Sequence, residues 1–415
     1  MDIIIGAGVS GLSYAMFRGN DYLVLEKESC VGGYCRTTCR NGFVWDYSGH
    51  FFHFQDPTIK NIILDEICTD DIVCVNKCTH IKYKDRLINF PFQKNIHQLD
   101  KEEFIDCLVD LFESGEKEYH TFKGMLYAKF GRSIAEKFLI PYNTKLYATD
   151  LDCLDSNAMG RFFPYAEKEE IVRNFRQMSN MSYNGSFIYP REGAIVYIRQ
   201  ILKRIASERI QTSCSVTNID AQTKTVMLSD GRQLHYDRLI STMPFVKLLD
   251  KVGMDYNPSI YNWNKVLVFN MGFDRKGCNI EDHWLYFPES SYCFYRVGFY
   301  DNILGSDRMS LYVELGFSKE EEINPEEWLP RVLSDLKQTG IVGKEQMMID
   351  YESIIMDPAY VHISDASRRD VDEKKKLLAE MDIYSIGRYG SWTYCSIEDN
   401  IKEAQNLVKR IADEL

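Results

Sequence analysis

Three glycines and one acid near the start of the chain have the types and spacing that bind a dinucleotide. An apolar strand expected over residues 2–5 leads into Gly6-Ala7-Gly8-Val9-Ser10-Gly11, and Glu26 closes a second expected strand over 21–25. Gly6 permits the tight turn, Gly8 lets the backbone approach a pyrophosphate, and Gly11 lets the next helix pack on the strand. The helix start offers free N–H groups to phosphate. Glu26 can accept the ribose hydroxyls, and its charge would repel a 2′-phosphate.

A second group of residues suits a longer cofactor. Lys27 follows Glu26, and Gly32-Gly33 and Arg36 come soon after. A second glycine pair and an arginine supply backbone donors and a cation for a pyrophosphate and a ribityl chain. We therefore predict FAD. This stretch resembles the start of the FAD-dependent amine oxidase superfamily, which implies a Rossmann-like (GR2-type) FAD-binding domain. The expected cofactor-binding residues are Gly6, Gly8, Ser10, Gly11, Glu26, Lys27, Gly33, Arg36, His50, Val216, Gly387, Arg388 and Asp399.

Five separated segments carry aromatic rings and cations. They are residues 49–53, 89–95, 142–148, 284–296 and 387–394. In this order and at these separations they resemble the UDP-galactopyranose mutases, closer to the eukaryotic type than to the shorter bacterial type. The resemblance covers essentially the whole chain, in islands.

This resemblance implies an isomerase, an intramolecular transferase that converts UDP-galactopyranose to UDP-galactofuranose or acts on a close UDP-sugar analogue. N5 of reduced FAD would bond to the sugar while UDP leaves and returns, with no net oxidation. It also implies an external reductant and a place in cell-surface polysaccharide biosynthesis. The catalytic residues would be His50, which tunes the flavin, Arg296, which stabilises the diphosphate, and Arg388, which lies against the flavin.

The resemblance also implies a set of substrate-binding residues. Uracil, a flat ring, would stack on aromatic side chains and pair with Gln93. A guanidinium binds a diphosphate better than an ammonium does, which suits Arg296, and two tyrosines would donate hydroxyls to the same phosphates. The full expected set is Phe92, Gln93, Asn143, Tyr147, Arg161, Tyr286, Arg296, Tyr360 and Tyr394.

Three places depart from the family pattern. Ile303 stands where the family carries a tyrosine, and Phe162 where it carries a second diphosphate arginine. Arg161 lies one residue earlier, and whether it substitutes is left open. Within residues 397–400 only Asp399 matches. These departures weaken the assignment of galactose as the sugar more than they weaken the assignment of a UDP-sugar as the substrate. A related mutase that acts on an N-acetylated or deoxy sugar therefore stays an open alternative.

Two other classes of protein stay open. One is an FAD-dependent oxidase or dehydrogenase of the amine oxidase superfamily, which would have an aromatic cage and little need of Arg296. The other is a non-catalytic flavoprotein subunit, against which Arg36, His50, Arg296 and Arg388 argue. The sequence does not identify the sugar or the reductant, which could be NADPH, NADH or another. It also does not determine the oligomeric state, for which a homo-oligomer is one possibility.

Length, composition and charge limit the possible kinds of protein and of binding partner. With 415 residues, two or three domains are expected. A net charge of −12 without a basic run argues against nucleic acid and anionic membrane surfaces as partners. No apolar run is long enough to span a bilayer, and a strand at residue 2 leaves no room for a signal peptide. Twelve cysteines lack a disulfide framework, and Cys74 and Cys78 have helical spacing but no zinc-like partner pair. A cytoplasmic protein is expected.

Hydrophobic patterns predict the elements that position these residues. Apolar residues at helical spacing predict a helix over 57–68 and a mostly helical block over 100–178, with Asp100 in a capping box. A hairpin is expected over 216–228, a strand over 236–242, and a second sheet from 265–273 and 309–317. A helix should follow Asn324.

The chain end is expected to return to the nucleotide fold. A strand over 382–386 and a turn over 387–390 precede a helix capped by Ser396, whose dipole would point at the flavin. The expected fold is α/β, with a discontinuous FAD-binding domain (1–88, 186–245 and 376–415). A helical substrate or lid domain (89–185) would be inserted, and 246–375 would form a mainly antiparallel β-sheet domain.

Overall fold

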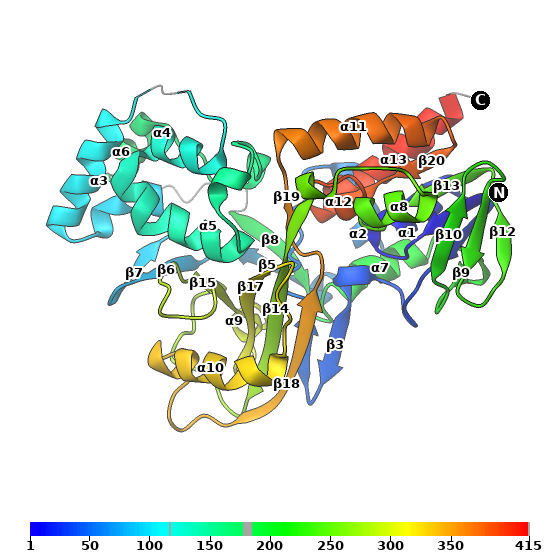
Figure 1. The fold of residues 1–415 in the computed structure, drawn as a ribbon. Helices are drawn as coiled ribbons and strands as arrows, with labels where there is room; N and C mark the ends of the chain where they lie inside the picture. Colours follow the sequence, from blue (N-terminus) through cyan, green and yellow to red (C-terminus); the bar gives the residue numbers. More distant parts are fainter. Residues whose placement is uncertain (116–117, 177–184, 414–415) are drawn as a thin grey trace.

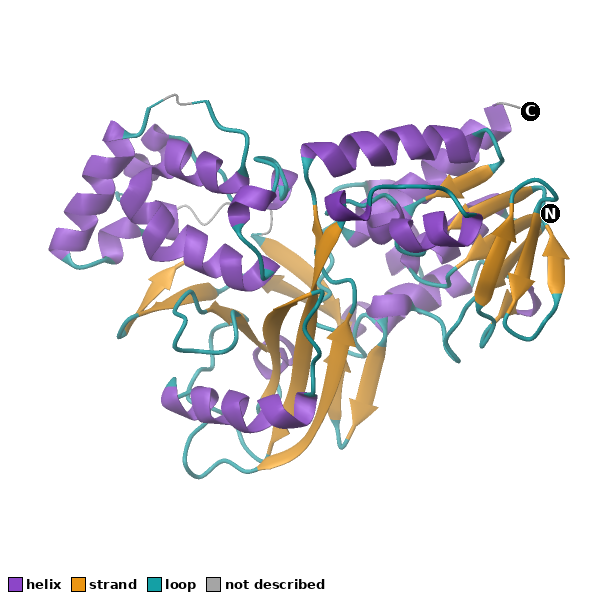
Figure 2. Ribbon diagram, viewed as in Figure 1, coloured by secondary structure: helices purple, strands orange, loops and turns teal. Residues whose placement is uncertain are grey.

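The computed structural model describes residues 1–115, 118–176 and 185–413 (Figure 1). Three regions are visible: a parallel sheet between helices, a group of helices, and a large antiparallel sheet (Figure 2). This mixed α/β architecture confirms the predicted fold class. The expected end of the helical block, residue 178, lies outside the described residues. No described helix combines the length and the apolar character needed to cross a membrane.

The parallel sheet forms the nucleotide fold. Its strand order is β20-β13-β1-β2-β9, and every neighbouring pair is parallel. Ile3 and Ile4 of β1 are fully buried, because helices cover both faces. Both expected return strands, near 240 and 384, are confirmed. The elements are β1 (Asp2–Ile5), α1 (Val9–Arg18), β2 (Tyr22–Leu25), α7 (Ile195–Leu202), β9 (Ile210–Gln211), β13 (Arg238–Ser241), β20 (Ile383–Ser385) and α13 (Ile397–Asp413).

The second sheet is mainly antiparallel. Its order is β18-β14-β17-β16-β15-β6-β7, with β19 paired to β14. The long strands β14 and β17 confirm the expected second sheet. The elements are β6 (Thr79–Tyr83), β7 (Arg86–Asn89), β14 (Asn262–Phe273), β15 (Trp284–Tyr286), β16 (Arg296–Phe299), β17 (Ser310–Ser318), β18 (Met348–Met356) and β19 (Val361–His362).

One expected domain boundary differs from the strand pairing. β6 lies within the expected FAD-binding segment 1–88 and β7 reaches its end, yet β6 pairs in parallel with β15, so both strands belong to the mainly antiparallel sheet. The sequence did not reveal this, because β6 and β15 are far apart along the chain. The rest of the domain division stays a prediction.

The inserted helices pack closely where a glycine allows it. Gly131 has φ +75°, and a Cβ there would lie 2.4 Å from the Asp110 carbonyl oxygen, so α4 bends against α3. The expected capping box at Asp100 is wrong: its carboxylate makes no cap and pairs instead with Arg86 at 2.5 Å. The helices are α3 (Lys101–Glu113), α4 (Phe122–Ile134), a π-helix (Ala135–Leu139), α5 (Ile140–Tyr147) and α6 (Lys168–Asn174).

The remaining elements connect these regions. The hairpin over 216–228 and the helix capped by Asn324 are confirmed, whereas residues 387–390 form a short helix rather than a turn. The helix predicted over 57–68 ends at Leu64. The strands are β3 (Thr37–Arg40), β4 (Phe43–Asp46), β5 (Ile72–Asn76), β8 (Ser186–Pro190), β10 (Val216–Asp220), β11 (Thr225–Leu228) and β12 (Gln233–His235). The helices are α2 (Pro57–Leu64), α8 (Phe245–Val252), α9 (Tyr300–Leu304), α10 (Pro325–Gln338), α11 (Asp365–Ala379) and α12 (Gly387–Gly390).

Candidate active site

The glycine turn after β1 exposes bare backbone. Gly6 has φ +101°, and a Cβ on Gly11 would lie 2.0 Å from the Gly6 carbonyl oxygen, so only glycine fits both positions. A Cβ on Gly8 would meet nothing nearer than the Gly33 Cα at 3.9 Å. The two glycine segments predicted from the sequence therefore face each other and leave a cradle that side chains do not fill. The N-terminus of α1 opens into this region because Gly8 is its N-cap.

Glu26 is held at the end of β2 by backbone donors. Its carboxylate accepts N–H bonds from Ala7 at 2.7 Å and Glu28 at 2.9 Å. Lys27 instead pairs with Glu28 at the surface, and its side chain is 71% exposed. Val216, the first residue of β10, is buried in the hydrophobic core. Glu26 is thus positioned for a ribose, whereas Lys27 points into solvent.

Two arginines border the region expected to hold the cofactor. Arg36 donates to the Gly33 carbonyl oxygen at 2.9 Å, which fixes it beside the second glycine pair. Arg388 lies over the rings of Tyr394 and Tyr360, with its guanidinium carbon 4.7 and 5.1 Å from their centroids. Its Nε is buried and has no hydrogen-bond partner among the described residues. A flavin dinucleotide fits this arrangement, because it fills the glycine cradle and offers acceptors to a buried, unpaired N–H.

Asn400 joins the elements around Arg388, and sequence reasoning missed it. Its Oδ1 accepts from the Ser10 hydroxyl at 3.0 Å and from the Arg388 backbone N–H at 2.9 Å. Gly387 has φ +86°, and a Cβ there would lie 2.5 Å from the Ser10 Oγ. The starts of α1, α12 and α13 therefore meet at one point. Asp399, a predicted cofactor-binding residue, accepts from the Ser396 backbone N–H at 2.8 Å and pairs with Arg161.

His50 is neutral at physiological pH. Burial, with a smaller contribution from the charges of Arg388 and Arg296, lowers the pKa of His50 to about 4, although the bond to the Ser48 carbonyl and the charge of Glu314 oppose the shift. Its Nδ1 lies 3.2 Å from the Ser48 carbonyl oxygen, which fits an N–H donor at Nδ1 and leaves Nε2 as an acceptor. The three predicted catalytic residues, His50, Arg296 and Arg388, therefore lie close enough for the two arginine charges to affect the pKa of His50.

A cavity of about 460 Å³ lies between the inserted helices and the antiparallel sheet. Six of the nine predicted substrate residues line it: Asn143, Arg161, Tyr286, Arg296, Tyr360 and Tyr394. They come from α5, a 3₁₀ turn (Gly160–Phe162), β15, β16 and the segments beside β19 and α12. Six separate parts of the chain therefore contribute to one cavity wall.

Three predicted substrate residues do not line the cavity. Phe92 is fully buried and stacks on Phe138 at 5.2 Å between centroids. Gln93 is also fully buried and donates its amide to the Pro164 carbonyl oxygen. Tyr147 is 2% exposed, and burial raises its pKa well above the ordinary tyrosine value. These side chains pack into the core of the inserted helices, so they support the cavity wall from behind.

Arg296 is the best-fixed cation in the wall. It lies on β16 directly opposite Glu314 of β17, and its Nε and Nη2 both lie 2.6 Å from one Glu314 oxygen. Burial works against the charge, yet Glu314 raises the pKa of Arg296 well above the ordinary value. The other Glu314 oxygen accepts from the Ser48 hydroxyl. Sequence reasoning missed Glu314, although an acid inside an apolar strand was a signal.

Lys145 organises the loop that follows Tyr286, and sequence reasoning assigned it no role. Its Nζ donates to four carbonyl oxygens, those of Phe287, Glu289, Tyr292 and Phe294, at 2.5 to 3.0 Å. Burial lowers the pKa of Lys145 to about 8, so the ammonium remains largely charged at pH 7. One side chain of α5 therefore sets the path of the chain from β15 to β16.

Aromatic rings form the opposite part of the wall. Phe51 stacks on Trp284 at 5.4 Å with 6° between the rings, and Phe90 lies 4.8 Å from Tyr286. Lys77 lies 5.1 Å from the Phe90 ring, and burial lowers its pKa to about 8. Sequence reasoning assigned a role to Tyr286, but none to Phe51, Phe90, Trp284 or Lys77.

The 3₁₀ turn that ends at Phe162 closes one side of the cavity. Arg161 Nη2 lies 2.7 Å from both oxygens of Asp399, and Phe162 packs edge-on to Tyr394 at 4.9 Å. Ile303, the other departure from the family pattern, is buried in α9 and does not line the cavity. The guanidinium of Arg161 is therefore engaged by α13, at the edge of the site.

Behind this wall, His362 makes stability depend on pH. Burial lowers the pKa of His362 to about 4 from 6.5; its bond to the Tyr147 carbonyl and Glu320 oppose this shift, and Lys319 adds to it. Between pH 6.5 and 4 the unfolded chain therefore takes up a proton that the folded chain refuses. The stability is fully present above pH 6.5 and is lost as pH falls.

Between pH 7 and pH 4.5, we expect the free energy of unfolding to fall by about 2 kcal/mol less in the His362→Gln variant than in the unsubstituted protein. Urea unfolding at the two pH values measures this difference. His235→Gln, at an exposed histidine on β12, is the matched control. Equal pH dependence in all three proteins would contradict the assignment.

Comparison with known proteins places this geometry among flavoproteins. A family model described as flavin containing amine oxidoreductase matches residues 17–351. The corticosteroid-binding protein of Candida albicans (strain SC5314 / ATCC MYA-2876) is 32% identical over 94 residues. That match covers 20% of this chain and 19% of the yeast protein, so it spans about a fifth of the relative's length.

Solved structures share the fold over the whole chain. A reduced UDP-galactopyranose mutase superposes with a TM-score of 0.92 at 23% identity, covering 100% of this chain and 94% of that one. A putative protoporphyrinogen oxidase from Exiguobacterium sp. 255-15 gives 0.79 at 15% identity, covering 100% and 99%. A CLA-producing fatty acid isomerase from P. acnes gives 0.67 at 14%, covering 99% and 98%. At these identities the likenesses establish the fold.

Proposed function

The chain belongs to the flavin-containing amine oxidoreductase family and binds FAD, and from this premise we propose that it is a UDP-sugar mutase. The proposed reaction interconverts the pyranose and furanose forms of UDP-galactose or of a close analogue. The whole-chain likeness to a reduced UDP-galactopyranose mutase supports this proposal, at a higher TM-score than the likenesses to the oxidase and the fatty acid isomerase.

The observation that carries the proposal is the partly buried guanidinium of Arg296 in the cavity wall, which Glu314 holds through two nitrogen atoms. Tyr360 and Tyr394 line the same cavity and stack on each other at 5.7 Å. A fixed cation with phenol hydroxyls nearby suits a diphosphate, which needs planar charge-assisted donors. An amine substrate gains nothing from a fixed cation. The cavity volume of about 460 Å³ lies in the range of small-molecule sites.

Each residue has a separate task in this reaction. Reduced FAD, when bound, supplies a nucleophilic nitrogen that can take up and return the sugar without net oxidation. Arg296 binds the diphosphate and stabilises its charge as UDP departs. Arg388 and neutral His50 hold the cofactor side of the cavity, with His50 Nε2 available as an acceptor. The inserted helices and Phe162 exclude water from the reacting carbon.

A second function, an FAD-dependent amine oxidase or dehydrogenase, is favoured by one observation. Phe51, Phe90, Trp284 and Tyr286 form an aromatic wall on one side of the cavity, which would suit an amine or another apolar substrate. In this function Arg296 would serve only to pair with Glu314.

The two functions are separated by one assay. The holoprotein is reduced anaerobically and incubated with UDP-galactose, UDP-glucose and UDP-N-acetylgalactosamine, and the nucleotides are separated by anion-exchange chromatography. We expect a new peak of unchanged mass from one donor with the reduced protein, and none with the oxidised protein. Absence of an isomer from every donor, with oxygen consumed on an amine, would support the oxidase instead.

Three further expectations belong to this proposal. A mutase of this kind would act in cell-surface polysaccharide biosynthesis in the cytoplasm and would draw on an external reductant. The identity of the sugar and of the reductant follows from the same assay when NADPH and NADH replace the chemical reductant. Whether the protein forms a homo-oligomer stays open.

A further inference from the structure

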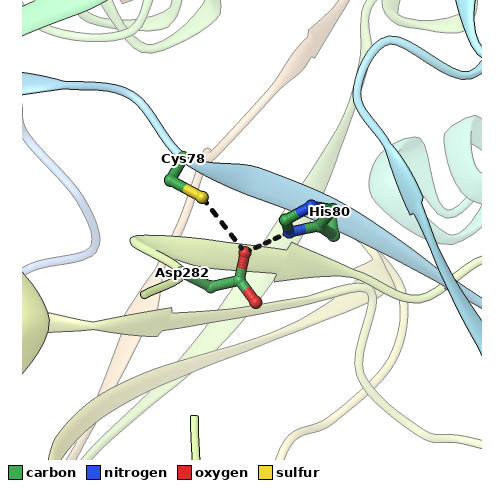
Figure 3. A group of neighbouring side chains, drawn as sticks. All are labelled: Cys78, His80 and Asp282. Carbon is green, nitrogen blue, oxygen red and sulfur yellow. Dashed lines mark hydrogen bonds and ion pairs between the residues drawn. The ribbon is translucent and has the colours of Figure 1, made fainter. Parts of the chain in front are cut away.

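Three side chains from two distant parts of the chain, Cys78 and His80 from one and Asp282 from the other, converge (Figure 3). Cys78 precedes β6 and His80 lies two residues later, so both project from the same face of the strand. Asp282 precedes β15, which pairs in parallel with β6. Asp282 Oδ1 lies 2.5 Å from His80 Nδ1 and 3.9 Å from Cys78 Sγ. The three atoms all lie within 4.8 Å of one another.

Neighbouring groups orient two of these side chains, Asp282 and His80. Asn279 donates to the other Asp282 oxygen at 2.7 Å. Asn89, directly opposite His80 on β7, forms a side-chain hydrogen bond with the imidazole. Metal sites typically hold their ligands in place by outer hydrogen bonds of this kind. The carboxylate of Asp282 is 4% exposed, so the cluster has one buried charge and a partly open thiol.

We propose that Cys78 Sγ, His80 Nδ1 and Asp282 Oδ1 bind one Zn²⁺ ion, with a water molecule at the fourth position. Sulfur with imidazole nitrogen and a carboxylate selects zinc over calcium or magnesium, which prefer oxygen alone. A thiolate and a carboxylate balance the two positive charges. Binding releases the Cys78 thiol proton and any proton held between His80 and Asp282.

The required rearrangement is small. Tetrahedral zinc places a sulfur and an oxygen ligand about 3.6 Å apart and a nitrogen and an oxygen ligand about 3.4 Å apart. The present separations of 3.9 and 2.5 Å therefore change by less than about 1 Å, within reach of side-chain rotation.

The proposed site lies next to two cavity residues. Lys77 directly precedes Cys78, and Trp284 follows Asp282 by two positions; both line the cavity. A metal here would tie the β6 segment to the β15 segment and so fix that part of the wall. This role is separate from FAD and from the proposed reaction.

Co²⁺ titration of the FAD-loaded, chelator-treated protein tests the proposal, because cobalt bound to a thiolate has a charge-transfer absorption that free cobalt lacks. We expect one equivalent to give this band, and zinc to remove it and to raise the melting temperature. Cys78→Ser should lose the band, and His80→Gln should weaken cobalt binding at least tenfold. Cys74→Ser, at an exposed cysteine on β5 that is not part of the cluster, should behave as the unsubstituted protein does.

Absence of the band would overturn the proposal. Cobalt binding by the Cys78→Ser or His80→Gln variant that equals binding by the unsubstituted protein would also overturn it. The metal would then be bound elsewhere, for example by another of the twelve cysteines. Flavin absorbance checks that each variant is folded, so a misfolded Cys78→Ser protein still leaves the His80→Gln comparison.

Discussion

Replacing Arg296 with alanine is expected to weaken the binding of UDP at least about a hundredfold, because two charge-assisted hydrogen bonds to the diphosphate are lost. FAD should stay bound, since the glycine cradle and Glu26 lie on the parallel sheet, away from β16. Calorimetric titration of the oxidised holoprotein with UDP measures the affinity, and the flavin spectrum confirms the cofactor. Unchanged UDP affinity would remove the diphosphate role of Arg296.

The same substitution also leaves Glu314 unpaired. Glu314 is 1% exposed, and breaking a buried ion pair by removing one partner costs about 3–5 kcal/mol. We therefore expect Arg296→Ala to melt at a lower temperature as well as to bind UDP poorly.

A double variant separates these two effects. Arg296→Met with Glu314→Gln removes both charges at similar volume and should recover most of the stability but none of the UDP affinity. Arg296→Lys keeps the charge without the planar fork, and its affinity should lie between those of the alanine variant and the unsubstituted protein. Recovery of UDP binding in the double variant would show that the alanine variant failed through misfolding.

Replacing Gly8 with alanine is expected to give a folded but colourless protein. Gly8 has φ −83°, which alanine adopts without strain, and the added methyl group would lie 3.9 Å from the nearest protein atom, the Gly33 Cα. The methyl group would, however, stand in the cradle between the two glycine segments where the pyrophosphate must approach. Flavin absorbance at unchanged circular dichroism measures the effect, and we expect FAD affinity to fall by more than about a hundredfold, as for a steric block of a backbone contact.

Two other glycines provide the controls. Gly11→Ala places a methyl group 2.0 Å from the Gly6 carbonyl oxygen, so we expect it to impair folding itself. Gly115→Ala meets no atom within 4 Å and should retain both fold and colour. A yellow Gly8→Ala protein with normal FAD affinity would contradict the position assigned to the pyrophosphate.

The nucleotide fold and the cofactor could be predicted from the sequence, because their determinants are local. A run of buried apolar residues makes a strand, and glycine at Gly6 and Gly11 is required by a turn only a few residues long. Glu26 ends the next strand, so its place near Ala7 follows from the parallel pairing of consecutive βαβ strands. The second sheet was likewise visible, in the apolar strands later named β14 and β17.

The candidate site was predictable in part. Arg296, Tyr286, Tyr360 and Tyr394 were found through the resemblance of separated segments to a known family, and the structure brings them to one cavity. Phe92 lies in one of the same segments but faces the core. Aromatic residues serve a core or a ligand equally well, and only the direction of the side chain separates the two.

The tertiary structure alone decided the contacts between distant strands and helices. Glu314 meets Arg296 because β16 and β17 pair in one register, and Lys145 meets four carbonyls because α5 lies beside the loop after β15. Cys78 and Asp282 meet because β6 pairs with β15 in parallel. Local sequence determined which elements form and which residues can bind a dinucleotide. Strand register and side-chain direction, which depend on packing of the whole chain, decided which charges and donor atoms meet.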